Sequence, residues 1–265
     1  MARRSIRTRA DSLLVAILVI GVAATVFPTS GAAASGPPTT TAPWPKLYGN
    51  QRLLSDTTWI PARVYWTSSD PSGIQCTESQ DMFGGVYSST GVTCPSGTPT
   101  TFSTWTLEQP TAGQTFAPTR VDATNIFNVT SPWVYGPSFT ILPGFQESSS
   151  AITYQGTWAL QSYPDAWGGS LMASSAAGAS ATFSFTGRSI AWVTSRGRAY
   201  GKADVYLDGT LAKTVDTYVG SYVEKRAWML YAHSWRRDSP HTIRVVVDGA
   251  TGRPEVDVDA FIVMQ

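Results

Sequence analysis

Residues that build catalytic and metal sites are scarce in this sequence, which has two cysteines and two histidines among 265 residues. A metal centre or a catalytic thiol would find few partners beyond His233 and His241. The chain also lacks a Gly-x-Ser-x-Gly elbow, which many serine hydrolases use, and an Asp-rich calcium loop of the EF-hand kind. We therefore predict a binding protein without catalytic residues, metal ligands or a cofactor, rather than an enzyme.

A strong excess of positive or of negative charge is also missing. Removal of residues 1–34 would take away four of the 19 basic and one of the 18 acidic residues, which leaves a net charge of −2. Because nucleic-acid-binding proteins present a basic face, we predict no nucleic-acid partner. A second long apolar run is absent too, so we predict no membrane association once the first run has been removed.

That first run has the setting of a cleavable signal peptide over residues 1–34. Four arginines precede an uncharged apolar stretch from Leu13 to Phe27, and three alanines follow at 32–34. The stretch has 15 residues, whereas a membrane-spanning helix needs about 20, so cleavage after Ala34 is favoured over an uncleaved anchor. The arginine pair at 3–4 leaves both the general secretory and the twin-arginine routes open. We predict a secreted, extracellular protein.

The two cysteines, Cys76 and Cys94, are most simply one disulfide in an exported chain. Residues 35–45 hold four prolines among threonines and are predicted to form an extended linker. Residues 46–147 carry short apolar segments between turn signals, which predicts a first β-sandwich. The candidate strands of that sandwich are 64–66, 102–107, 115–123 and 138–142.

Alternation of apolar and polar residues becomes clearer after the serines at 148–150, where we place a domain boundary. Asp208-Gly209 lies between two alternating runs, which predicts a hairpin with a type I′ turn over Tyr206–Val215. Trp192, between Ala191 and Val193, is predicted to lie in the core. Strands without helices over residues 150–265 indicate two packed sheets or a jelly roll, so the whole chain is predicted to be all-β, with two β-sandwich domains.

The string FTGRSIAWVTSRGRAYGKADVYLDGTLAKTVDTY, at 185–218, resembles the galactose-binding-like, carbohydrate-binding-module-like jelly rolls of exported bacterial proteins. Ser239 to Val245, SPHTIRV, and Val256 to Val263, VDVDAFIV, extend the similarity, which covers residues 150–265. The resemblance implies a jelly-roll fold, frequent carbohydrate binding and, in some members, a structural calcium ion. Gly113 to Asn125, GQTFAPTRVDATN, more distantly resembles the immunoglobulin-like or fibronectin type III modules that precede such jelly rolls.

Two carboxylates could serve glycoside hydrolysis, and Asp257 and Asp259 share one predicted strand face. Acids on a single strand cannot flank a bond from opposite sides, so we favour backbone capping or pairing with an arginine such as Arg244. His241, at a strand start, is predicted to be structural, and His233 to lie in a loop.

Aromatic residues, in contrast, are abundant: ten Trp, eleven Tyr and ten Phe. Sugars stack their C–H faces on such rings and hydrogen-bond to nearby polar groups. The predicted ligand-binding residues lie beside turns in the C-terminal half and are Tyr163, Trp167, Arg196, Arg198, Tyr200, Tyr222 and Trp235.

These observations favour a secreted, non-catalytic protein that recognises carbohydrate or cell-envelope glycan through the C-terminal jelly roll. Two alternatives stay open. The chain could be a structural or adhesive surface protein that binds another protein through a sheet edge or an aromatic patch. It could also be a glycan-active hydrolase whose site assembles from residues distant in sequence.

Overall fold

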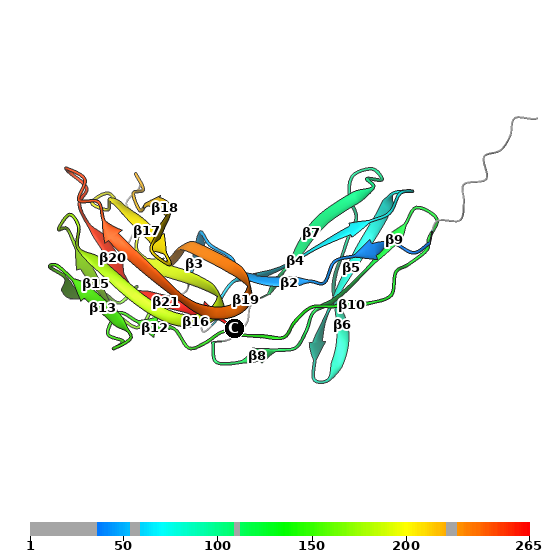
Figure 1. Ribbon diagram of the computed structural model, residues 1–265, viewed down its shortest axis with the longest axis horizontal. Coiled ribbons are helices and arrows are strands. Elements are labelled where there is room, and N and C mark those ends of the chain that lie inside the picture. The colour runs from blue at the N-terminus through cyan, green and yellow to red at the C-terminus, as the bar shows by residue number, and fades with distance from the viewer. Residues whose placement is uncertain (1–35, 54–58, 109–111, 221–226) are drawn as a thin grey trace, which may run out of the picture. The chain divides into compact units, whose positions relative to one another are not determined.

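The computed structural model describes residues 36–53, 59–108, 112–220 and 227–265. In these ranges every regular element is a β-strand, as Figure 1 shows, so the predicted all-β class is confirmed. The signal peptide predicted over residues 1–34 lies outside the described residues. No helix in the described ranges could cross a membrane.

Two antiparallel sheets form the N-terminal β-sandwich. In the first, β4 (Ala62–Ser69) pairs along one edge with β1 (Thr39–Thr40) and β2 (Trp44–Leu47), and along the other with β7 (Thr101–Glu108). The second sheet has the order β10 (Val134–Tyr135), β9 (Arg120–Asn125), β5 (Ile74–Phe83), β6 (Val86–Thr93). Strand β4 alternates strictly between buried and half-buried residues, so one face packs inward and the other faces solvent.

Residues 35–45 differ from the extended linker that was expected. Thr39 and Thr40 pair with Ser68 and Ser69, and Trp44 begins a four-residue strand. The prolines are compatible with this because β1 and β2 lie at an edge of the sheet, where a missing N–H is tolerated. The segment therefore adds side chains to the sheet.

The C-terminal part contains the largest sheet, in the order β12-β21-β16-β19-β17-β18, with β13 pairing to β16 and β3 to β19. A three-stranded sheet, β14-β15-β20, accompanies it, and a short pair, β8-β11, completes the list of sheets. The bounds are β3 Gln51–Arg52, β8 Thr115–Phe116, β11 Phe139–Thr140, β12 Phe145–Gln146, β13 Ile152–Gln155, β14 Ala159–Ser162, β15 Ser170–Ser174, β16 Ser180–Thr194, β17 Lys202–Leu207, β18 Thr210–Asp216, β19 Trp228–Val247, β20 Val256–Val258 and β21 Ala260–Met264.

The predicted hairpin is confirmed. Strands β17 and β18 pair antiparallel, and Asp208 and Gly209 between them have φ angles of 49° and 81°. Both values are positive, as a type I′ turn requires.

The apolar run in the middle of β16 is explained by burial on both faces of the sheet. Trp192 is fully buried, as predicted, in the cluster that holds the stacked rings of Phe183 and Phe261, 5.2 Å apart. The neighbouring Ala191 and Val193 point the other way, into a second cluster with residues from the N-terminal part of the chain, among them Leu47, Ile60 and Ala62. Residues 35–265 accordingly form one compact unit.

The predicted disulfide between Cys76 and Cys94 is present and ties the end of β6 back to β5. Replacing both cysteines by serine is expected to lower the free energy of unfolding by about 3 kcal/mol, because the cross-link restricts the unfolded chain over a separation of 18 residues. Urea unfolding of the wild type and of the variant, each with and without reductant, measures this. Reductant should affect only the wild type, and equal stability of all four samples would contradict the expectation.

Candidate functional site

Three aromatic side chains form a row across the solvent-facing side of the first N-terminal sheet. Trp44 of β2 lies directly opposite Tyr65 of β4, and Tyr65 lies directly opposite Trp105 of β7. Directly opposed residues place their side chains on the same face of a sheet, about 5 Å apart at Cβ. We call these three residues the aromatic row.

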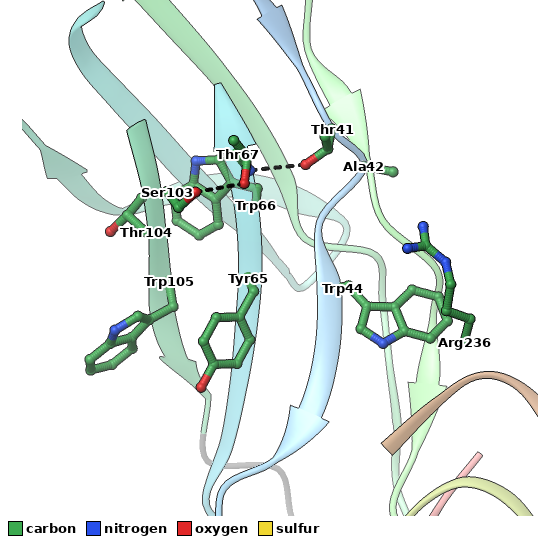
Figure 2. A pocket seen from close by; sticks show the side chains of 10 residues that line it. All are labelled: Thr41, Ala42, Trp44, Tyr65, Trp66, Thr67, Ser103, Thr104, Trp105 and Arg236. Atoms are coloured by element: carbon green, nitrogen blue, oxygen red, sulfur yellow. Dashed lines mark hydrogen bonds between the residues drawn. The ribbon is translucent and has the colours of Figure 1, made fainter. Parts of the chain in front are cut away.

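The row faces a hollow of about 480 Å³. Figure 2 shows Tyr65 between Trp105 and Trp44, with hydroxyl side chains above them and Arg236 beside Trp44. Trp105 is 41% exposed, whereas Trp66, one residue beyond Tyr65, is only 3% exposed because it points into the sandwich. The row is therefore an outward face and is not part of the core.

Hydroxyl groups border one side of the row. Thr67 and Ser103 exchange a hydrogen bond of 2.8 Å, and the N–H of Thr67 donates to the hydroxyl oxygen of Thr41 at 2.9 Å. These groups are held in place by neighbouring strands and remain part of the lining of the hollow. Rings for stacking and hydroxyls for hydrogen bonding thus stand side by side.

Cations stand close to the rings of the row. Arg63, next to Tyr65 on the same face of β4, lies between two rings, with its Cζ 3.2 Å from the centroid of Tyr48 and 3.5 Å from that of Trp105. Lys46 Nζ is 5.2 Å from the centroid of Tyr65. Arg236 Cζ is 5.8 Å from the centroid of Trp44. Among the described residues, rings rather than carboxylates hold these cations.

The aromatic residues predicted for the jelly-roll site do not form a comparable surface. Tyr163, Trp167 and Trp235 each pack against a different apolar cluster. Trp235 and His233 lie within β19 and not in a loop. Trp235 stacks on His241 at 3.7 Å between centroids, which supports the structural role predicted for that histidine.

Tyr200 is buried, at 3% exposure, and not available on the surface. Burial, followed by the nearby Asp257 carboxylate, raises the pKa of its phenol far above the usual value. The remaining predicted positions are loop residues with local roles: Arg198 donates to the carbonyl of Gly220 at 2.7 Å, and the Cζ of Arg196 is 5.2 Å from the ring of Trp228. Tyr222 lies outside the described residues.

Asp257 and Asp259 cap backbone, which was one of the two roles predicted for them. Asp257 accepts from the N–H of Ser195 at 2.9 Å and from the Thr194 hydroxyl at 2.8 Å, and Asp259 accepts from the N–H of Trp167 at 2.9 Å. The two carboxylates do not pair with Arg244, whose guanidinium lies over the ring of Tyr206. Burial raises the pKa of Asp259 to about 8 and also raises that of Asp257.

One hydrogen-bonded chain has the order of a serine-hydrolase relay. The Oγ of Ser239 lies 2.7 Å from Nε2 of His241, whose Nδ1 lies 2.8 Å from a carboxylate oxygen of Asp208. The residue after Ser239 is Pro240, which has no N–H to stabilise an oxyanion. Asp208 also accepts from the N–H of Thr242 at 2.8 Å. The hydrogen bonds of Asp208 to His241 and Thr242 therefore hold the β17–β18 turn against β19.

Metal ligation has no visible support in the described ranges, where no three His, Cys, Asp or Glu side chains are placed to hold an ion. The structural calcium implied by the family resemblance stays a prediction.

No known protein-family profile matches the chain. Over 131 residues it is 28% identical to a protein of Flavonifractor plautii named A type blood N-acetyl-alpha-D-galactosamine deacetylase, which is 49% of this chain and 16% of the relative. Over 115 residues it is 30% identical to the A type blood alpha-D-galactosamine galactosaminidase of the same organism, which is 43% of this chain and 10% of the relative. The chain spans less than a fifth of either relative.

Among solved structures, similarity extends to a family 35 carbohydrate-binding module from Clostridium thermocellum, with 15% identity and a TM-score of 0.33 over 46% of this chain and 97% of the module. A family two carbohydrate esterase from Cellvibrio japonicus gives 10% identity and a TM-score of 0.38 over 48% of this chain and 34% of the esterase.

The sequence pattern alone does not reveal the aromatic row. Trp44 stands in the segment expected as a linker, and Tyr65 and Trp105 stand in two strands that are about 40 residues apart. Alternation places Arg63 and Tyr65 on one face of β4, but only the register between strands brings Trp44 and Trp105 beside them.

Proposed function

We propose that this chain is a secreted, non-catalytic glycan-binding protein that stacks its ligand on the aromatic row. The observation that carries the proposal is the alignment of Trp44, Tyr65 and Trp105 on three adjacent strands beside a hollow bordered by hydroxyls. Rings that are fixed by a sheet lose little freedom on binding, and the C–H faces of sugars match their apolar surface. Both curated relatives carry names of enzymes that act on amino sugars of glycans, which supports the same ligand class.

The spacing of the row favours a chain of sugars over a single one. Neighbouring strands lie about 4.8 Å apart, so the outer rings stand on backbones about 10 Å apart. A ligand that touches both Trp44 and Trp105 must extend across this distance. Free monosaccharides should therefore compete poorly with oligosaccharides.

Glycan arrays and pull-downs on insoluble polysaccharides test the proposal. The expected result is retention on at least one glycan class, with competition by soluble oligosaccharides of that class and weak competition by its monosaccharide. Lack of retention on every glycan tested would contradict the proposal. Stoichiometric capture of a purified surface protein with no glycan retention would favour the adhesive alternative.

A further inference from the structure

We propose that the aromatic row selects acidic glycans, those that carry carboxylate groups on their sugars. The inference rests on the proposed function and names the ligand class of that same site. Its basis is the set of cations around the row: Lys46, Arg63 and Arg236. Two of them form a cross-strand pair, because Lys46 of β2 lies directly opposite Arg63 of β4. On the same face of the sheet, this pair is the neighbour of the pair Trp44–Tyr65.

These cations are not neutralised within the part of the chain that the structure describes. The ion pairs found there join Arg188 to Asp238, His241 to Asp208 and Arg253 to Asp216. None of the three cations around the row takes part in one. Among the described residues, the hollow is lined by one cation, hydroxyls, aromatic rings and an alanine, with no carboxylate.

A neighbouring arginine, Arg188, differs from these cations because it is paired with a carboxylate. Arg188 also approaches Trp44, with its Cζ 5.4 Å from the ring centroid, but it makes two hydrogen bonds of 3.2 and 2.8 Å to Asp238. Its charge is therefore used inside the protein. Lys46 and Arg236 are exposed, and neither takes part in an ion pair among the described residues.

Ring contact also prepares Arg63 for anion binding. A guanidinium held between Tyr48 and Trp105 has little freedom left to lose, and its Nε is buried without a hydrogen-bond partner among the described residues. A fixed guanidinium binds a carboxylate with better geometry than a mobile one. Sugar stacking on Trp105 would place ring substituents within reach of this group.

An acidic polysaccharide fits this surface better than a nucleic acid does. Both present rings and negative charge, but the predicted mature chain has a net charge of −2, and the cations beside the row form a small group of Lys46, Arg63 and Arg236. Non-specific nucleic-acid binding depends on many phosphate contacts along a basic surface. A few carboxylates on a stacked sugar chain need only the cations present here.

The test uses polygalacturonate and the same polymer after chemical reduction of its carboxyl groups, so that only the charge differs. Affinity electrophoresis or calorimetry at low salt should give at least about fivefold tighter binding of the acidic polymer, with the preference lost at high salt. Lys46→Gln and Arg236→Gln should each weaken binding of the acidic polymer about threefold. Each should weaken binding of the reduced polymer by a smaller factor than binding of the acidic polymer.

Lys213→Gln, an exposed lysine of β18, is the matched control and should change nothing. Binding by Arg63→Gln is compared with binding by the wild type only if the two proteins unfold at the same temperature. Equal, salt-insensitive binding of the two polymers would overturn the inference and leave the proposed function standing. Failure to retain either polymer or any array glycan would overturn both, and preference for oligothymidylate over polygalacturonate would overturn the inference in favour of a nucleic acid.

Discussion

The double variant Trp44→Ala/Trp105→Ala is expected to lose glycan retention, with a fall in affinity of about a hundredfold. Each substitution removes a stacking contact worth about 1–2 kcal/mol at the centre of a binding surface. Each 1.4 kcal/mol of binding free energy corresponds to a factor of ten in affinity. Tyr65→Ala alone should lower the affinity about tenfold, because it removes one ring, which lies between the other two. Calorimetry with the glycan that the array identifies measures these changes.

A matched control separates the row from exposed aromatic residues in general. Tyr218, in the jelly-roll part of the chain, is 41% exposed, as is Trp105. Tyr218→Ala should bind glycan as the wild type does. Trp235→Ala tests the surface in the C-terminal half that the sequence favoured. If this variant loses affinity for glycan while the variants of the aromatic row keep theirs, the binding site lies in the C-terminal half.

Asp259→Asn is expected to stabilise the protein by a few kcal/mol at pH 8 and to have little effect at pH 4. The side chain is fully buried, and one of its oxygens has no hydrogen-bond partner in the described ranges. Burial raises its pKa from 3.8 to about 8, and the carboxylates of Asp257 and Glu147 add to the rise.

The sign follows from the protonation of the two states. The unfolded chain releases this proton above pH 4, whereas the folded chain keeps it until about pH 8. Stability from this group is therefore present at low pH and is lost between pH 4 and 8. Asparagine is neutral throughout and avoids the loss, while the oxygen of its amide can still accept from the N–H of Trp167.

Thermal unfolding of wild type and Asp259→Asn from pH 4 to 9 measures the effect. The gap between the two midpoints should widen up to about pH 8 and then stay constant. Asp248→Asn, which removes an exposed carboxylate after β19, serves as the control and should show no such pH dependence. A constant gap across the whole range would contradict the assignment of a neutral, buried Asp259.

Local patterns predicted the elements well. Alternation and the Asp208-Gly209 pair predicted the β17–β18 hairpin, because turn type depends on residues adjacent in sequence. The pairing of Cys76 with Cys94 needed no geometry, since the chain contains no other cysteine. The burial of Trp192 followed from its apolar neighbours in a strand.

The candidate site could not be predicted in the same way. Its rings come from strands that the register of the sheet brings together, and register is a long-range property. The opposite case is Tyr200, which follows a turn-rich segment and still points inward toward Asp257. Position beside a turn says little about the direction of a side chain.

Hydroxyl-radical footprinting with and without the retained glycan tests the central claim most directly. Mass spectrometry of the oxidised peptides would report the protection of each aromatic side chain in the intact protein. We expect the glycan to protect Trp44, Tyr65 and Trp105 and to leave Tyr218 unchanged. Protection of Tyr163 and Trp235 with no change in the aromatic row would contradict the account.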